Sequence, residues 1–447
     1  MSATMKRGGT LARSVVLLMA TAIALAGCGH ARADYIAAQE AAGNGTGGDT
    51  GGGTDANGSP LPSDGDSVPV QPVDPAPLGV QLDTFFGASA AGMYNAAVSG
   101  YYAANAIEAG FIPGTPDQDP IAAVMEDGGP EVLMASVPAV LQARETTGAD
   151  LVLVAQLFQR SGNALVAPKG TRLDSLKAFK GKAIGTLTLG SRGLDLAAAL
   201  AAAGLGDGAV ETVGDYDFVP DPSMVALPDL LRSASVAAAE VTVWDEYAQL
   251  QEFGTQDGQD PYTAGQLTTQ SLDVSGDSLL GEGIFVRASW LAADPANGEA
   301  LVRFLRATFE GYADCRDHVL DCAQLTVDQG APLPVGHQEW GVNEVNALIW
   351  PAPGGIGALP DGGWDATIKR LVDTGLLAAP PPAAAVDLSY AEKARSTANG
   401  LDLVATGFTK GTVAITPGGE GSDPVPSIDP GDNSGTGDAS PDPSTAP

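Results

Sequence analysis

One stretch, Val236 to Leu250, sets the strongest limit on what this chain can fold into. Its first half is short, mostly apolar and rich in β-formers, as in strands that are covered on both faces. Its second half places Trp244, Asp245, Glu246 and Tyr247 where such a strand gives way to a helix. Open α/β sheets bind ligands beyond the carboxyl ends of their strands. An indole and a phenol beside two carboxylates suit a small, planar, polar or cationic molecule.

A purely structural interpretation of these residues is also open. Asp245 would cap the following helix, and Trp244 would fill the core. Asp245 and Glu246 are adjacent in the sequence, so we expect their side chains to point apart, and a shared substrate cannot be assumed.

Strands alternate with helices from Leu78 to Leu377, which predicts an α/β fold with a parallel or mixed sheet. The almost continuously apolar run Leu151 to Phe158 is typical of a central strand. Two α/β units joined by two crossings would give a hinged pair of lobes with the ligand between them. The predicted boundaries are residues 78–167 and 278–390 for the first lobe, 168–277 for the second lobe and 391–415 for a C-terminal extension.

The two ends of the chain have a different composition. Residues 28–77 and 416–447 are rich in Gly, Asp, Ser, Thr and Pro, which predicts a disordered acidic tether and a disordered acidic tail. The formal charge of −32 and the pI near 4.1 argue against nucleic acid as a partner, because a phosphate backbone requires a basic face.

Residues 1–27 resemble a bacterial lipoprotein signal, with a basic start, an apolar centre and Leu25-Ala26-Gly27 before Cys28. This resemblance implies that Cys28 carries lipid and anchors the protein to the cell membrane, facing the extracytoplasmic side. The alternative is an ordinary cleaved signal with an incidental cysteine.

Export implies an oxidising environment, in which Cys315 and Cys322 form an even pair suited to a disulfide. A metal pair with His318 is the competing interpretation, but no third ligand has suitable spacing. Phosphate-cradling, zinc-helix and serine-elbow motifs are missing from the sequence, and three histidines leave little for acid–base work. We therefore expect no metal, no cofactor and no enzymatic activity.

Four stretches together resemble the substrate-binding proteins of ABC importers, in the group of the thiamine-pyrimidine (THI5/NMT1-like) and sulfonate binders. They are Met93–Tyr102, Leu173–Lys182, Val243–Glu252, and Phe304–Tyr312 taken with Trp340–Pro351. The resemblance implies a periplasmic-binding-protein-like type II fold. It also implies capture of a small molecule for a membrane permease and its ATPase.

In similar proteins the cleft receives side chains from four places. At those places this chain has Phe85 and Phe86, Ser161 and Asn163, Ser191 and Arg192, and Trp244 with Asp245 and Glu246. Relatives carry Tyr-Asn-Glu-Tyr where this chain has Trp-Asp-Glu-Tyr, a difference that turns an amide into an acid. The cysteine-rich iron site of the pyrimidine synthases in the wider family has no counterpart here, so the resemblance implies no synthase activity.

The predicted ligand is a small heteroaromatic metabolite, foremost a thiamine pyrimidine precursor, because Phe85, Phe86 and Trp244 are stacking candidates. Riboflavin is the main alternative within transport. Sulfonates are a weaker one, since Arg192 is the one plausible anion partner. An enzyme acting on the same ligand, and a sensory or scaffold lipoprotein, are the alternatives outside transport.

Overall fold

The computed structural model describes residues 74–115, 118–173, 175–187, 193–206, 208–214, 227–272, 279–398 and 400–421. Several sequence predictions lie outside these ranges: the signal peptide with Cys28, nearly all of the tether, most of the tail, and the site candidates Ser191 and Arg192.

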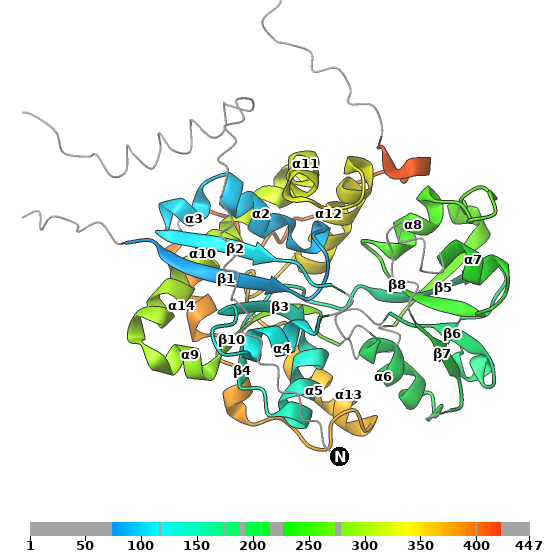
Figure 1. Cartoon of the computed structure of the whole chain (residues 1–447), viewed down its shortest axis with the longest axis horizontal. Helices are drawn as coiled ribbons and strands as arrows, with labels where there is room; N and C mark the ends of the chain where they lie inside the picture. The colour runs from blue at the N-terminus through cyan, green and yellow to red at the C-terminus, as the bar shows by residue number, and fades with distance from the viewer. Residues whose placement is uncertain are drawn as a thin grey trace, which may run out of the picture. The chain divides into compact units, whose positions relative to one another are not determined.

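The described chain is built on two five-stranded mixed sheets, each the centre of one lobe (Figure 1). The first sheet has the order β2-β1-β3-β10-β4, and its strands are β1 (Ala76–Leu82), β2 (Ile107–Ile112), β3 (Val132–Ser136), β4 (Leu151–Gln156) and β10 (Glu282–Arg287). The second sheet has the order β7-β6-β8-β5-β9, and its strands are β5 (Asn163–Pro168), β6 (Ala183–Gly185), β7 (Glu211–Val213), β8 (Ala238–Thr242) and β9 (Leu267–Ser271). This is the periplasmic-binding-protein type II arrangement that the sequence predicted.

Strand direction follows the same plan in both sheets. Strand β1 runs parallel to β2 and β3, whereas β10 runs antiparallel to β3 and β4. In the second sheet β6 runs parallel to β7 and β8, whereas β5 runs antiparallel to β8 and β9. The antiparallel strands β5 and β10 are the first strands after the chain crosses between the lobes. The first crossing lies before Asn163, which corrects the predicted boundary after residue 167.

Helices cover both faces of the first sheet (Figure 1). On one face lie α2 (Ala91–Val98), α3 (Tyr101–Ala104), α10 (Pro295–Asp317) and α12 (Val335–Ile349), and on the other lie α4 (Pro120–Met125), α5 (Val137–Thr147) and α13 (Gly363–Asp373). Strand β3 serves both layers: Val132 and Met134 join the first core, and Leu133 and Ala135 join the second. Successive side chains of a strand point to opposite faces, so a doubly covered strand reads as an unbroken apolar run.

The predicted central position of the strand at Leu151 to Phe158 is wrong. Strand β4 is fully buried, yet it is the last strand in the order of its sheet. Its outer edge is covered by α14 (Ser389–Thr397) and by a bridge from Leu153 to Val386 beside the turn η5 (Ala383–Ala385). The apolar run therefore reports burial and not a central position.

The second lobe is smaller. Its helices are α6 (Leu194–Ala202), α7 (Leu227–Arg232) and α8 (Glu246–Glu252), with short turns of 3₁₀ helix at η2 (Leu176–Phe179) and η4 (Ala264–Gln266). Leu250 of α8 is fully buried with Val241 of β8, so α8 belongs to the core of this lobe. Helix α6 ends before Gly204, whose φ of 75° suits a residue without a side chain.

Helices α9 (Ala288–Ala293) and α11 (Val319–Gln329), and the turn η1 (Ala88–Ala90), complete the first lobe. Cys315 near the end of α10 is joined to Cys322 of α11 by a disulfide, as predicted. Among the described residues, no helix has both the length and the apolarity needed to span a membrane.

The C-terminal segment 400–421 returns along the first lobe. Lys410 lies 2.6 Å from a carboxylate oxygen of Glu344 on α12, and Asn343 donates a hydrogen bond to the carbonyl of Gly411. The segment ends in the turn η6 (Pro417–Gly419), which packs against α8 and α12. The predicted disordered tail therefore begins no earlier than residue 422.

Candidate functional site

A pocket lies where three parts of the chain meet, and we call it the Phe85 pocket. The parts are the loop after β1, the corner between β8 and α8, and the start of α12. The described residues that line it are Thr84, Phe85, Phe86, Gly87, Ala88, Ser89, Trp244, Asp245, Glu246, Pro332, Leu333, His337 and Gln338. The Phe85 pocket lies at the carboxyl ends of parallel strands in both sheets, where open α/β sheets bind their ligands.

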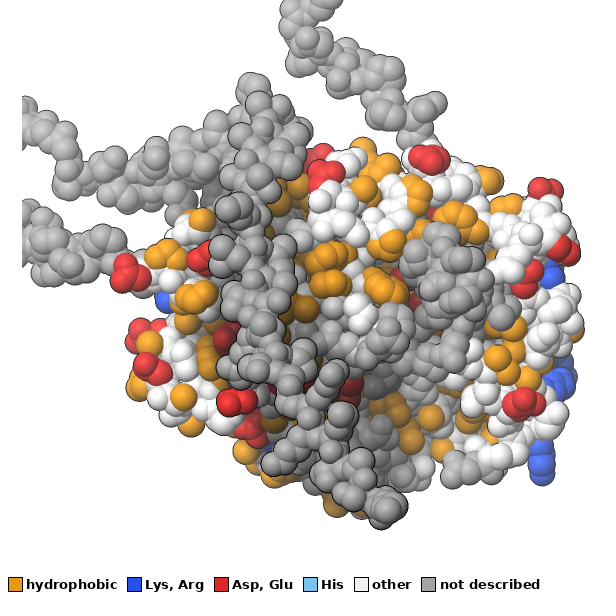
Figure 2. Space-filling model, viewed as in Figure 1, with side chains coloured by type: hydrophobic (Ala, Val, Ile, Leu, Met, Phe, Trp, Pro, Cys, Tyr) orange, Lys and Arg blue, Asp and Glu red, His pale blue; other side chains and the backbone are white. Residues whose placement is uncertain are grey.

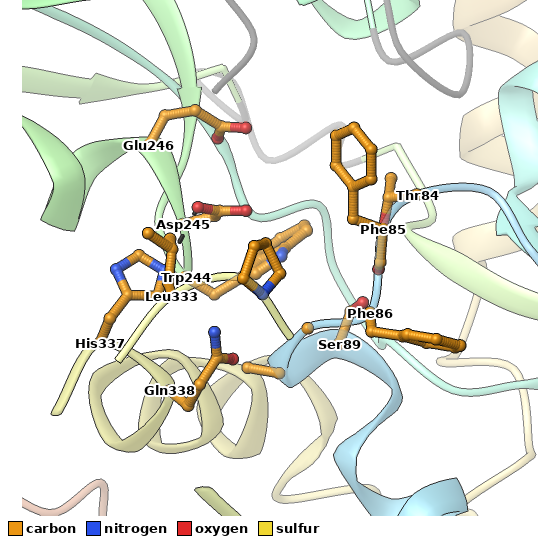
Figure 3. A pocket seen from close by; sticks show the side chains of 13 residues that line it. Thr84, Phe85, Phe86, Ser89, Trp244, Asp245, Glu246, Leu333, His337 and Gln338 are labelled. Carbon is orange, nitrogen blue, oxygen red and sulfur yellow. Dashed lines mark hydrogen bonds and ion pairs between the residues drawn. The ribbon is translucent and has the colours of Figure 1, made fainter. Parts of the chain in front are cut away.

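Hydrogen-bond acceptors gather on one wall of this pocket. In Figure 3 the side chains of Asp245, Glu246 and Gln338 point into the space that the ring of Phe85 borders from the other side. The Oε1 atom of Gln338 is buried and accepts no hydrogen bond from the described residues. Within the described part of the chain, no Lys or Arg lines the pocket. The wall therefore favours a ligand that donates hydrogen bonds over an anion.

Positively charged side chains lie elsewhere. Five exposed cations, Lys169, Arg172, Lys177, Lys180 and Lys182, follow β5 and precede β6 on the outer surface of the second lobe. Figure 2 shows Lys and Arg side chains at the outer edge of this lobe. None of the five lines the Phe85 pocket.

An acid–histidine–acid group underlies the pocket wall. The Nδ1 atom of His337 lies 2.7 Å from Oε2 of Glu252, and its Nε2 lies 3.3 Å from Oδ1 of Asp245. His337 and Glu252 are almost completely buried, whereas the Asp245 side chain keeps 29% of its surface exposed. His337 comes from α12 of the first lobe and both carboxylates come from α8 or its N-cap, so the group links the two lobes.

This environment changes the protonation of His337. Burial alone would lower its pKa, but the hydrogen bonds and charges of Asp245 and Glu252 outweigh burial and raise the pKa to about 9. His337 is therefore an imidazolium at neutral pH, and each ring nitrogen donates to one carboxylate.

Trp244 and Phe86 are mainly packing residues. Trp244 is 5% exposed, belongs to the core of the first lobe and meets Phe158 edge-on with ring centroids 5.6 Å apart. Phe86 turns away from the carboxylates and meets Tyr94 edge-on at 5.8 Å (Figure 3). Phe85, the third predicted stacking ring, lies on the border of the cavity opposite the carboxylates (Figure 3).

Two predictions about the β8–α8 corner need correction. Asp245 occupies the N-cap position, but its side chain makes no capping hydrogen bond and reaches His337 instead. Asp245 and Glu246 both line the pocket, although they are neighbours in the chain. The periodicity argument fails because Asp245 has neither strand nor helix dihedrals, with φ −138° and ψ −93°. Glu246 Oε2 also accepts from the backbone N–H of Thr242 at 2.7 Å.

The other described candidates lie apart from this wall. Ser161 borders a separate, smaller hollow with Asp195 and Arg370. Asn163 donates from Nδ2 to Oδ2 of Asp195 at 3.0 Å, and its backbone N–H donates to Oγ of Ser161. The structure thus brings Phe85, Phe86, Trp244, Asp245 and Glu246 together, and it leaves Ser161 and Asn163 outside the Phe85 pocket.

The pocket is narrow in this conformation. Its cavity volume is about 30 Å³, which is room for only one or two water molecules. Entry of a ring-containing ligand therefore requires movement of Phe85 or of one lobe against the other, as hinged binding proteins allow.

Sequence reasoning missed His337 and Gln338 as site residues. One signal was present: Asp245 and Glu252 are seven positions apart, which places both carboxylates on one side of a two-turn helix. A cation from another element can lie beside two acids so placed, but the sequence does not say which one.

Both nitrogens of His337 are already bonded to carboxylates, so neither is available as a general acid or base toward a ligand. Across the described residues, no group of three or more His, Cys, Asp and Glu side chains is arranged to hold a metal ion.

A family model described as NMT1/THI5 like matches residues 88–318. The chain belongs to the NMT1/THI5-like family. The matched region covers the β8–α8 corner with Asp245 and Glu246. It ends before α12, so His337 and Gln338 of this NMT1/THI5-like protein lie beyond it. No curated protein sequence matches the chain significantly.

Several solved structures are similar to the chain, and the first of them supports the fold. A protein from Bordetella bronchiseptica RB50 is 15% identical, with a TM-score of 0.53 over 73% of this chain and 99% of that one. The ligand-binding component of an ABC-type import system from Staphylococcus aureus is 12% identical, with a TM-score of 0.49 over 71% of this chain and 98% of that one. The aliphatic sulphonate binding protein SsuA from Escherichia coli is 14% identical, with a TM-score of 0.48 over 71% of this chain and 92% of that one.

An enzyme is similar to a comparable extent. The desulfurization enzyme DSZB is 12% identical, with a TM-score of 0.45 over 72% of this chain and 99% of that chain.

Proposed function

We propose that this protein is the solute-binding component of an ABC import system. It captures a small heteroaromatic metabolite between its lobes and delivers it unchanged to a membrane permease, which an ATPase drives. The family, the type II fold and the S. aureus relative support this class of function. The ligand that fits the site best is a thiamine pyrimidine precursor of the hydroxymethylpyrimidine type.

The observation that carries the ligand proposal is the composition of the Phe85 pocket. Two carboxylates and the unsatisfied Oε1 of Gln338 face one aromatic ring, and no described Lys or Arg lines the space. An aminopyrimidine offers an amino group and a hydroxyl as donors and a flat face for Phe85. Buried acceptors left unpaired are costly, so ligands that lack donors are disfavoured.

Riboflavin and sulfonates are the competing ligands of the same fold. Riboflavin also presents a ring and donors, but its larger ring system needs a wider opening of a pocket that is narrow here. A sulfonate would bring negative charge against Asp245 and Glu246, which repel it. The observed wall therefore favours the pyrimidine.

A binding role also agrees with the absence of a poised nucleophile among the lining residues that the structure describes. Ser89 is the hydroxyl at the base of the pocket, and its neighbours there include no histidine with a free ring nitrogen. We propose that Phe85, Asp245, Glu246 and Gln338 contact the ligand. The predicted contacts of Ser161, Asn163, Ser191 and Arg192, and the lipid anchor on Cys28, remain proposals.

A thermal-shift panel of hydroxymethylpyrimidine, thiamine, riboflavin and alkanesulfonates tests the proposal, together with mass spectrometry of compounds that copurify. We expect the pyrimidine to raise the unfolding temperature most and to be recovered unchanged. A shift from sulfonates alone would contradict the ligand class, and chemical conversion of the added compound would contradict the binding role.

A further inference from the structure

The two ends of α8 are tied to one residue of the other lobe. Asp245 precedes the first residue of α8 and Glu252 is its last residue, and both bond to the imidazole of His337 on α12. Glu252 does not line the Phe85 pocket, whereas Asp245 does. The ring thus stands between a carboxylate that faces the cavity and one that faces the protein interior.

We propose that His337 is a positioning residue, which holds the Asp245 carboxylate at the mouth of the pocket as the acceptor for a cationic or amino-bearing ligand. Oδ1 of Asp245 is fixed by Nε2 of His337 and by the side-chain amide of Gln249. An acceptor fixed before the ligand arrives costs less ordering on binding. The ligand class rests on the proposed function, and the positioning itself does not.

Helix α8 cannot easily turn away from His337. The corner before it is held by a hydrogen bond from Nε1 of Trp340 on α12 to the carbonyl of Val243, at 2.9 Å. The turn η6 closes the far side: a Cβ on Gly419 would lie 3.4 Å from the Glu252 carboxyl carbon and 3.5 Å from Cβ of His337. Asp245, His337 and Glu252, which we call the His337 clamp, are therefore held between α12 and η6, and among the three only Asp245 keeps substantial exposure.

The charges around the imidazole are mostly negative. The carboxylates that face it or lie on the elements packed against it are Asp245, Glu246 and Glu252 at α8, Glu339 and Glu344 on α12, and Glu420 beside η6. Glu344 is paired with Lys410. Removing Glu252 takes away the second acceptor of the ring without touching the cavity. His337 should then lose its proton at a pH closer to the ordinary pKa of histidine, and at that pH its hydrogen bond to Asp245 should be lost.

The test compares Glu252→Gln and His337→Gln with the wild-type full chain, using hydroxymethylpyrimidine as the calorimetric probe across pH. Lys369→Gln is the control, because it removes an exposed ion pair with Asp373 on α13, and neither residue lines the pocket. In wild type and control we expect affinity that stays flat up to about pH 8, below the pKa near 9. The affinity of Glu252→Gln for the probe should be about tenfold lower than that of wild type above neutral pH, and it should return to the wild-type value as the pH is lowered. The affinity of His337→Gln should be low at every pH.

A loss of thermal stability in Glu252→Gln with unchanged affinity and unchanged pH profile would overturn the positioning role. If wild type does not bind the probe, the proposed ligand is wrong, and the inference is then decided by carbon NMR of the Asp245 carboxyl in the ligand-free protein. The carbon chemical shift of this carboxyl should change at the pH at which His337 loses its proton, and that pH should be lower in Glu252→Gln than in wild type. Independent titration of the two groups would refute the clamp.

Discussion

Trp244 and Phe158 meet edge-on at 5.6 Å between ring centroids, although the first comes from the second lobe and the second from the crossing that leaves the first lobe. The indole is 5% exposed and is packed within the first core. The β8–α8 corner is therefore anchored in the opposite lobe by an apolar contact, beside the ionic contact of His337. Both contacts, like the hydrogen bond from Trp340 to Val243, join the two lobes at this corner.

Removal of the indole should cost stability more than ligand affinity. Trp244→Ala should lower the free energy of unfolding by about 3 kcal/mol, because a large buried side chain leaves a cavity. Urea unfolding measures this, and Trp290→Ala, a half-buried tryptophan on α9, should cost less. Unchanged stability with a large loss of affinity would instead identify Trp244 as a ligand-stacking residue.

Phe85→Ala should have the opposite effect. Its ring is half-buried and borders the cavity, so we expect affinity for the pyrimidine to fall by about 1 kcal/mol or more with little change in unfolding temperature. Parallel calorimetry and thermal unfolding check this. Equal affinity in variant and wild type would remove Phe85 from the ligand contacts.

Gly162 is required for the position of the indole. A Cβ on Gly162 would lie 2.3 Å from Cζ3 of Trp244, so Gly162→Ala must displace the ring or the crossing. We expect a loss of about 1–3 kcal/mol in urea unfolding, as for other overpacked cores. Gly110→Ala in β2 is the matched control, because its Cβ would meet no atom within 4 Å. Equal stability of the two variants would show that the contact is absent in solution.

The His337 clamp predicts a specific dependence of stability on pH. Its pKa is about 9 in the folded chain against an ordinary 6.5, so the folded state holds the proton more tightly. The stabilisation is fully present below pH 6.5 and is lost as the pH rises through 9, by up to about 3 kcal/mol.

Denaturant unfolding at a series of pH values measures this difference. His337→Gln should lack this part of the profile. His318→Gln, which changes the exposed histidine between α10 and α11, should retain it. A wild-type profile that is the same as that of His337→Gln would contradict a buried imidazolium.

The disulfide between Cys315 and Cys322 should stabilise the first lobe without influencing the pocket. The double change Cys315→Ala and Cys322→Ala should lower the free energy of unfolding by about 2 kcal/mol, since both residues are buried and close a loop between α10 and α11. Pyrimidine affinity should stay unchanged. Reductant added to wild type should reproduce the lower stability, and a large loss of affinity would show that the bridge shapes the site.

The sequence predicted the local elements well where one pattern dominates. Asp294-Pro295 begins α10 through an N-cap and a first-turn proline, and the apolar run at Val236 becomes the buried strand β8. The candidates at the β8–α8 corner do reach the pocket. Such patterns depend on neighbours in the chain, so they can be read without the fold.

Relationships between distant segments were not predictable in the same way. Phe85 and Phe86 have the same side chain and both line the pocket, and only the turn after β1 decides which ring packs against Tyr94. The approach of His337 to α8 depends on helices 85 positions apart in sequence. A burial pattern likewise cannot say whether β4 is central or terminal, because helices cover it in either case.

The most direct test of the account is calorimetric titration of hydroxymethylpyrimidine into the wild-type chain and into Asp245→Asn. The account predicts one ligand per chain with roughly micromolar or tighter affinity, at least tenfold weaker binding in Asp245→Asn, and recovery of the ligand unchanged. Absence of binding, equal affinity in the two proteins, or conversion of the ligand would contradict it.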